Sequence, residues 1–134
     1  MVIEPGVSVG PVHSGMTMQQ VVAELGEPDQ KQDGGMIYKN LGMAVGPDKG
    51  GIVQTVLCGA GGNTELTKSF AGHTKAGIGI GASRADVVSA YGNPTVTKSF
   101  GSKSQFEIIR YDSLGVQFTL SYDKVCVIAV FFKP

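Results

Sequence analysis

The chain has 134 residues, enough for one compact domain that buries roughly two thirds of its unfolded surface. Charged residues make up 16% of it, below the roughly 25% of an average protein, and its 20 glycines indicate many turns. Its 11 Lys and Arg residues balance its 11 Asp and Glu residues, so no net charge is available to attract nucleic acid or an anionic membrane.

The first ten residues, MVIEPGVSVG, contain neither the basic region nor the apolar region of a secretion signal. No apolar run anywhere in the chain approaches the roughly 20 residues that cross a bilayer. We therefore expect no membrane span. We expect a cytoplasmic location if Met1 is the native start, and a location in the cell envelope if a signal peptide has been removed.

The segment SGMTMQQVVAELGEPD has the start and stop signals of a short helix. Thr17 stands before the helical pattern and Gln20 follows three residues later, which together make a capping box. Gly26 supplies a left-handed stop, and the proline two residues beyond it prevents the helix from resuming. These signals predict a helix over residues 17–25.

After this helix the apolar pattern changes from helical to alternating, which indicates strands. The strands predicted in this part of the chain are 29–32, 36–39, 43–45 and 52–57. Asp33-Gly34-Gly35 reads as a hairpin turn between the first two strands. Residues 59–76, GAGGNTELTKSFAGHTKA, read as a glycine-rich linker.

Residues 77–94, GIGIGASRADVVSAYGNP, place glycines directly before a second helical pattern. A dinucleotide-binding loop needs G-x-G-x-x-G, and this segment offers only G-x-G-x-G, so we expect no cofactor here. Ser83 and Asp86 form a second capping box, and Gly92 stops the helix. The predicted helix covers residues 83–91.

Four longer strands are predicted after the second helix, at residues 94–100, 105–111, 116–122 and 125–132. The last of these has no charge and a high β propensity, so we expect it at the centre of a sheet or at a dimer seam. Six aromatic residues gather in this half: Phe100, Phe106, Phe118, Tyr122, Phe131 and Phe132. They indicate either an asymmetric core or an exposed patch.

The two halves of the chain are similar to each other. Residues 14–29 align with residues 80–95 without a gap, and a Tyr-x-x-Leu-Gly motif begins at both Tyr38 and Tyr111. A duplication of this length predicts an α+β fold of two tandem repeats, each a helix plus an antiparallel meander, packed together with the helices on one face of the sheets. The predicted organisation is repeat 1 at 1–58, a linker at 59–76 and repeat 2 at 77–134.

The pattern G-M-T-x-x-Q-V-x-x-x-L-G-x-P, beginning at Gly15, resembles the SmpA/OmlA family of small outer-membrane assembly lipoproteins. It is also similar to the tandem-repeat superfamily of the β-lactamase inhibitor protein. The opening I-x-P-G-x-S-V-G, beginning at Ile3, resembles more closely a group of uncharacterised bacterial proteins. The resemblance implies helices on one side of an antiparallel sheet, and contact with another protein as the function. No lipid-accepting cysteine follows a signal sequence here.

Few residues suggest catalysis. His13 and His73 are the only histidines, and neither sits in a pattern that supplies a catalytic triad or zinc-ligand spacing. Cys58 and Cys126 have no C-x-x-C partner and read as buried free thiols. We therefore predict no catalytic residue, metal or cofactor, and a protein that is not an enzyme.

Four residues are candidates for a binding surface. Glu107 and Arg110 lie in one predicted strand and differ in parity, so they face opposite sides of the sheet. Tyr38 and Tyr111 align between the halves, and each is either a core aromatic residue with its hydroxyl at the edge or part of a binding face.

We expect a module that binds another protein, or a second copy of itself, through a sheet surface. The alternative is a small-ligand or enzymatic role in a cleft between the two repeats.

Overall fold

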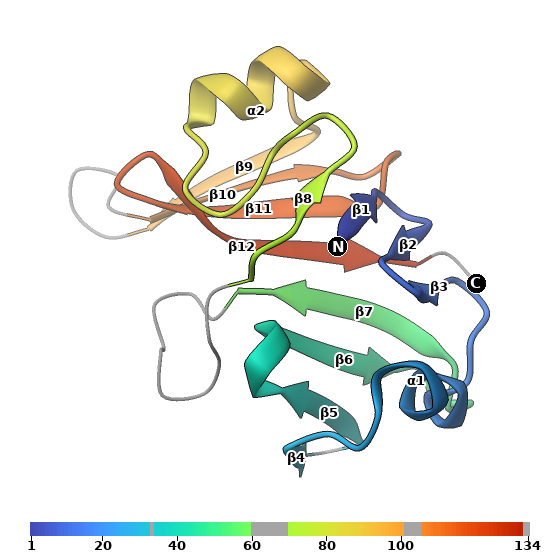
Figure 1. The fold of residues 1–134 in the computed structure, drawn as a ribbon. Helices are drawn as coiled ribbons and strands as arrows, with labels where there is room; N and C mark the ends of the chain where they lie inside the picture. The colour runs from blue at the N-terminus through green and yellow to red at the C-terminus, as the bar shows by residue number, and fades with distance from the viewer. Residues whose placement is uncertain (33, 60–69, 101–105, 133–134) are drawn as a thin grey trace.

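The computed structural model describes residues 1–32, 34–59, 70–100 and 106–132 (Figure 1). The first half of the chain contains β1 (Val2–Glu4), β2 (Ser8–Val9), β3 (Val12–His13), α1 (Met18–Leu25), β4 (Gln30–Gln32), β5 (Gly35–Tyr38), the 3-10 turn η1 (Lys39–Leu41), β6 (Met43–Pro47) and β7 (Val53–Cys58). The second half contains β8 (His73–Thr74), α2 (Arg84–Tyr91), β9 (Val96–Phe100), β10 (Phe106–Tyr111), β11 (Val116–Ser121) and β12 (Lys124–Phe131).

Eight of the strands form a single large antiparallel sheet. Its order is β4-β5-β6-β7-β12-β11-β10-β9, so β12 pairs with β7 of the first half on one side and with β11 on the other. The predicted central position of residues 125–132 is therefore confirmed. The predicted strands correspond to β4–β7 and β9–β12, whereas Asp33 of the predicted hairpin turn lies outside the described residues.

The predicted fold class is wrong. The described chain is mostly β, with only two short helices, and the strands of both halves merge into one sheet instead of forming an α+β pair of helix-plus-meander repeats. The physical reason is the pairing of β7 with β12, which runs from Thr55 opposite Phe131 to Cys58 opposite Ile128. Backbone hydrogen bonds across that pair join the two meanders edge to edge.

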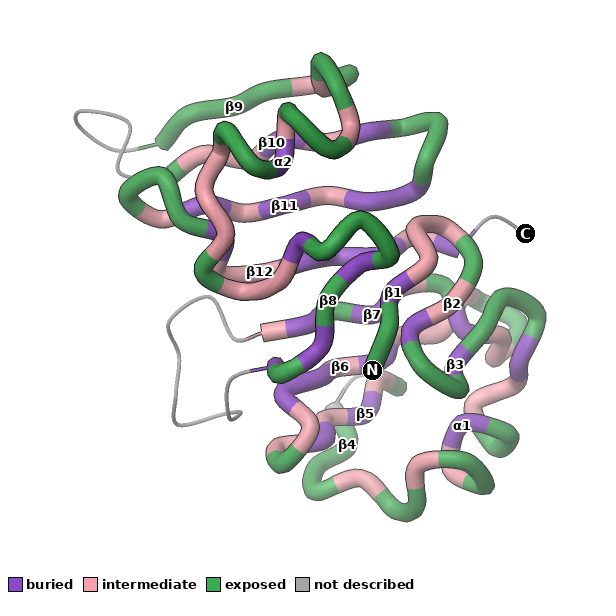
Figure 2. Tube along the Cα trace, turned by 45° about the horizontal axis from the view of Figure 1, so that its top comes forward, coloured by how far each residue is buried: buried purple, intermediate pink, exposed green. Residues whose placement is uncertain are grey.

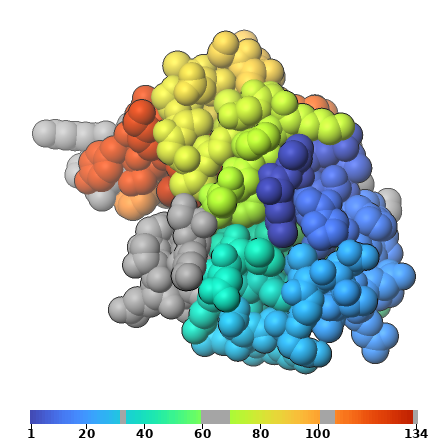
Figure 3. Space-filling model, viewed as in Figure 1, coloured from blue at the N-terminus to red at the C-terminus, as the bar shows by residue number. Residues whose placement is uncertain are grey.

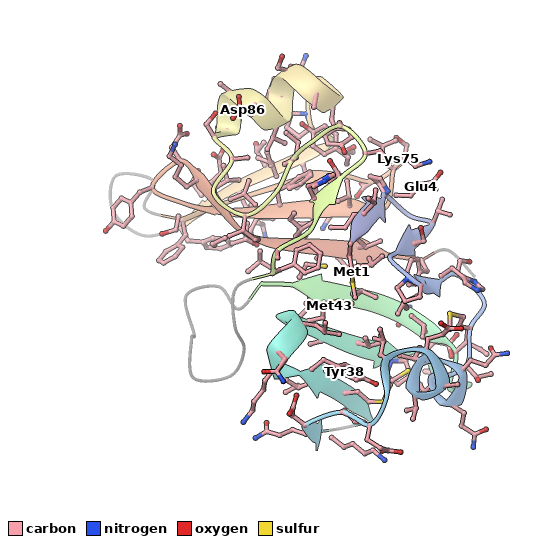
Figure 4. The ribbon with its side chains drawn as sticks, viewed as in Figure 1. Met1, Glu4, Tyr38, Met43, Lys75 and Asp86 are labelled. Carbon is pink, nitrogen blue, oxygen red and sulfur yellow. The ribbon has the colours of Figure 1, made fainter. Side chains whose placement is uncertain are left out.

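A second, four-stranded sheet was not predicted. Its order is β3-β2-β1-β8, and β1 pairs in parallel with β8, which lies inside the predicted linker. The N-terminal residues therefore lie beside the segment around residue 75, as Figure 3 shows. The exposed ion pair between Glu4 and Lys75, 3.1 Å from Oε2 to Nζ, spans the same two segments (Figure 4). Linker residues 60–69 lie outside the described part of the chain.

Both capping boxes are confirmed. Thr17 Oγ1 accepts from the Gln20 backbone N–H at 3.1 Å, and Gln20 Oε1 accepts from the Thr17 N–H at 2.9 Å. Ser83 and Asp86 make the same reciprocal pair at 3.1 and 3.2 Å. Each box satisfies N–H groups that the first helical turn leaves free, so both helices begin where the sequence predicts.

The core is one continuous cluster of buried side chains from both halves. Figure 2 shows that buried residues occur along the strands of both halves. The four-stranded sheet contributes Ile3 and Val9, and the helices contribute Val21 and Val87. These side chains pack on the buried side chains of the large sheet, which include Met43, Val45, Val56, Ile109, Phe118, Leu120, Ile128 and Val130. The small sheet and the two helices together therefore cover one face of the large sheet.

Candidate functional site

The other face of the large sheet carries no covering layer of described residues. Both helices and the four-stranded sheet lie against the opposite side (Figures 1 and 2). We call the uncovered side the open face. The solvated face of an antiparallel sheet normally carries polar side chains, so apolar side chains in this position call for an explanation.

The strand register identifies the side chains on the open face, because residues directly opposite each other in a sheet point to the same side. One row is Phe100, Phe106, Ser121 and Lys124, and the next is Lys98, Ile108, Thr119 and Val127. A third row crosses the whole sheet through Val96, Arg110, Gln117, Ala129, Leu57, Ala44, Ile37 and Gln30. A fourth, shorter row is Phe131, Thr55 and Gly46.

Large apolar side chains on the open face are accessible to water. Leu57 is 41% exposed, Phe100 46% and Phe106 36%. Their half-buried neighbours on the same face are Ile37, Val96, Ile108, Val127 and Phe131. Covering such surface contributes about 25 cal/mol for each Å² removed from water, so this face can supply binding free energy.

A shallow hollow of about 290 Å³ lies on the open face over β5, β6 and β7. It exists because Gly35, Ala44 and Gly46 place almost no side chain at the surface there. Ile37 and Leu57 contribute to its lining. A single apolar side chain of a partner would fit this hollow.

The charged side chains in the four rows are all basic. Lys98 and Lys124 are exposed, and neither makes an ion pair with a described residue. Arg110 Nε donates to Asp112 Oδ1 at 2.6 Å, and that carboxylate lies in the turn beyond the rows. The open face is therefore apolar and basic, and its complement is apolar and acidic.

Glu107 lies on the covered face. It stands opposite Leu120, whereas Arg110 stands opposite Gln117, so the prediction that Glu107 and Arg110 face opposite sides is confirmed. Glu107 Oε1 accepts from Arg84 Nε at 2.9 Å, and this ion pair ties α2 to the sheet. Of these two predicted site residues, only Arg110 belongs to the open face.

Tyr38 and Tyr111 are both buried on the covered face. The hydroxyl of Tyr38 donates to the Gly26 carbonyl at 2.9 Å, and that of Tyr111 donates to the Gly92 carbonyl at 2.8 Å. Burial raises the pKa of both phenols, so both stay protonated donors at neutral pH. Each tyrosine therefore links the end of a helix to the sheet by a hydrogen bond. The four predicted site residues, Glu107, Arg110, Tyr38 and Tyr111, do not come together in one site.

Two further hollows lie away from the open face. One, of about 270 Å³, includes Asp48, whose Oδ1 already accepts from the backbone N–H groups of Gly50 and Ile52 at 2.8 and 3.0 Å. The other, of about 350 Å³, lies between residues 76–78 and α2 and is lined by Asp86. Since the Asp86 carboxylate already accepts from the backbone at the start of α2, this hollow disfavours an anion.

The two halves of the chain meet along paired strands, not across an open cleft. β7 and β12 are hydrogen-bonded neighbours where the two halves meet, and the small sheet lies over the covered side of that junction (Figure 1). The pairing removes the gap that two separate repeats would have left. The hollow of about 270 Å³ that includes Asp48 touches both halves, because Phe132 lines it beside Gln54, but its other lining residues all belong to the first half.

The described residues offer little for catalysis. Nδ1 of His13 and of His73 lies 3.0 and 2.9 Å from the carbonyl oxygen of the following residue. No group of three His, Cys, Asp or Glu residues suited to a metal ion occurs in the described ranges. Burial raises the pKa of the Cys58 thiol to about 12 and also raises the pKa of Cys126, so neither is a thiolate at neutral pH.

Solved structures share this fold at low sequence identity. The DUF4309 family protein YjgB from Bacillus subtilis is 15% identical with a TM-score of 0.59, covering 89% of this chain and 80% of that one. An extracellular protein containing a SCP domain from Bacillus anthracis is 12% identical, with a TM-score of 0.55 and coverage of 96% and 46%. A cysteine-rich secretory protein from Staphylococcus aureus is 14% identical, with a TM-score of 0.53 and coverage of 97% and 46%.

The chain thus spans 46% of the length of the last two proteins. No protein-family model matches the sequence, and no curated protein matches it. The resemblance to SmpA/OmlA and to the β-lactamase inhibitor protein stays a prediction. No helix among the described residues is long and apolar enough to cross a membrane.

Leu57 and the pairing of Phe100 with Phe106 were not among the site residues that the sequence predicted. The aromatic residues of the second half did indicate a core or an exposed patch, and the structure places some of them in the core and others at the surface. Phe118 and Phe132 are in the core, whereas Phe100, Phe106 and Tyr122 are exposed. The parity of residues 96, 98 and 100 places them on one face, but no local pattern says that the face is uncovered.

Proposed function

We propose that this protein is a non-enzymatic binding module that presents the open face of its large sheet to another protein. The observation that supports the proposal is the open face itself, where Leu57, Phe100 and Phe106 stand in water without a described covering layer. Extended apolar patches on monomeric proteins mark interaction sites, and aromatic residues are enriched in such interfaces.

The chemistry of the face defines the partner. A partner that buries the apolar rows and carries acidic groups opposite Lys98 and Lys124 would satisfy both features. The hollow beside Gly46 would receive one apolar side chain of that partner as an anchor. A second copy of this chain is a poorer complement, because the charged side chains in the rows of its own open face are basic as well.

The comparisons support a module that works beside other domains. Two of the similar structures belong to larger proteins, named as extracellular and secretory, of which this fold accounts for 46%. Those names favour a location in the cell envelope over one in the cytoplasm.

The test is affinity capture from the native host with three variants of the full chain. Leu57→Asp places a charge on the open face, and Gly46→Val fills the hollow. Gly46 has no positive φ, and a Cβ there meets only the Thr55 carbonyl oxygen, at 3.9 Å, so this variant should fold. We expect both to lose at least ten-fold in retention of a partner that wild type holds, measured by quantitative mass spectrometry and repeated with the purified partner.

Val7→Asp is the matched control. Val7 is 48% exposed, comparable with Leu57, and lies between β1 and β2 of the small sheet. It should leave retention unchanged. If all four proteins retain the same set equally, the open face is not the binding surface. A dimer in sedimentation that Leu57→Asp dissociates would instead make a second copy the occupant.

A further inference from the structure

We propose that the partner adds an extended strand to the exposed edge of β9, with an acidic side chain opposite Lys98 and apolar side chains beside Val96 and Phe100. This inference rests on the proposed function and names how the partner binds. The added strand is one part of the contact, at the β9 edge of the sheet, and the rest of the partner lies across the open face toward Leu57.

The first support is the position of β9 in the sheet. β9 pairs with β10 on one side only, and four of its five residues are exposed. A strand in this position keeps one row of backbone N–H and C=O groups unpaired, which is the template that an added strand uses. The opposite edge, β4, has only three residues and is a poorer template.

The second support is the chemistry beside that edge. On the open face, Phe100 stands opposite Phe106, and Lys98 stands opposite Ile108. An added strand would place alternate residues beside Val96, Lys98 and Phe100 on this face. The complementary pattern is therefore apolar, any, acidic, any, apolar.

The third support is a strained turn at the same end of the sheet. Tyr122 and Asp123 connect β11 to β12, and both have positive φ, 48° and 70°. A two-residue loop of this geometry favours Asn-Gly, and a tyrosine there costs free energy. Tyr122 is 71% exposed and directly follows Ser121, which lies in the row of Phe106. The turn therefore presents a third exposed aromatic side chain at the end of the sheet that carries Phe100 and Phe106, at a cost that a binding role explains.

The experiment selects peptides from a random display library on the full wild-type chain. We expect enrichment of the apolar, any, acidic, any, apolar pattern. Selected peptides, made synthetically, should bind Lys98→Glu about ten-fold more weakly, because an attraction becomes a repulsion. Reselection on Lys98→Glu should enrich Lys or Arg at the former acidic position. Lys98 is exposed, so the substitution should not disturb folding, and circular dichroism checks this.

Lys31→Glu is the matched control, because Lys31 is an exposed lysine on the other edge strand, β4. It should leave peptide binding unchanged. Amide hydrogen exchange distinguishes strand addition from contact between side chains alone. On peptide binding, those amides of residues 96–100 that point away from β10 should become protected, and the amides of residues 30–32 should not.

The inference is overturned if no acidic–apolar pattern is enriched, if wild type and Lys98→Glu bind the peptides equally, or if the β9 amides stay unprotected. Any of these results, together with partner loss in Leu57→Asp and Gly46→Val, would leave the proposed function standing and limit the contact to the open face itself, without strand addition at β9.

Discussion

Three tyrosine hydroxyl groups near the helix ends differ in how they are paired. Those of Tyr38 and Tyr111 donate to helix-terminal carbonyls, whereas the buried hydroxyl of Tyr91 has no hydrogen-bond partner among the described residues. The ring of Tyr91 nevertheless packs well, with its centroid 5.7 Å from that of Tyr111 and 5.8 Å from that of Phe118. Its apolar part stabilises the fold while its polar atom is desolvated without compensation.

We predict opposite effects of removing these hydroxyls. Tyr111→Phe should lower the free energy of unfolding by about 1 kcal/mol, because the Gly92 carbonyl loses its donor. Tyr91→Phe should cause no loss, or a gain of up to about 1 kcal/mol, because it removes a desolvated hydroxyl and keeps the ring. Urea denaturation followed by circular dichroism measures both. Equal losses in the two variants would mean that Tyr91 has a partner after all.

Single residues in the sequence predicted some of these contacts and not others. The parity of Glu107 and Arg110 was enough to place them on opposite faces, because a strand alternates strictly. The alignment of Tyr38 with Tyr111 left a core and a surface role open, since tyrosine suits both. Their hydrogen bonds to the Gly26 and Gly92 carbonyls show that both tyrosines have the core role. Those bonds depend on how the helices pack on the sheet, which no local sequence pattern predicts.

Among the elements, the hairpin of β11 and β12 combines strands of six and eight residues with a turn whose residues do not favour its backbone conformation. Its loop residues Tyr122 and Asp123 occupy the left-handed region without being Asn or Gly. The Asp123 carbonyl accepts from the Arg84 backbone N–H at 3.1 Å, so the loop also touches the start of α2. This contact uses the backbone carbonyl of residue 123, so substituting the side chains of the turn keeps it.

Replacing Tyr122-Asp123 by Asn-Gly should therefore stabilise the protein by about 1 to 2 kcal/mol, because the new residues adopt positive φ at less cost. The midpoint of thermal unfolding measures the gain. The same variant should bind the peptides selected on wild type more weakly, since it lacks the exposed ring. A variant that is more stable and binds equally well would show that Tyr122 has no part in binding.

The elements that the sequence predicted are those with strong local signals. Both helices carry reciprocal caps, and the strands of the large sheet alternate over several residues. The strands β1, β2, β3 and β8 have two or three residues each, too few for a period to emerge. Their register depends on partners distant in sequence, such as Ile3 opposite Thr74, and no local pattern encodes that.

For the molecule as a whole, the likeness between the two halves predicted two helix-plus-meander repeats packed against each other. The pairing of β7 with β12 instead joins their strands into one sheet, because residues 125–132 are apolar on both sides and suit the middle of a long sheet. The same two-sided apolar character hid the open face from sequence analysis. Only the arrangement of all the elements shows which side of the sheet is covered.

A single core predicts a single unfolding transition. Val21 of α1 and Val87 of α2 belong to different halves but to the same buried cluster. Val21→Ala and Val87→Ala should each lower the free energy of unfolding by about 1 to 3 kcal/mol and leave one transition, with equal calorimetric and van't Hoff enthalpies. Two separate transitions, with each variant shifting only one of them, would contradict this prediction.

The order of strands in the large sheet also matters while the protein is being made. β7 ends at Cys58, but its partner β12 begins only at Lys124. During translation, the edge of β7 that pairs with β12 therefore stays unpaired until the strands between them have been synthesised. A growing chain in this condition is a natural client for chaperones that shield strand edges, and slow or interrupted synthesis would favour aggregation at that edge.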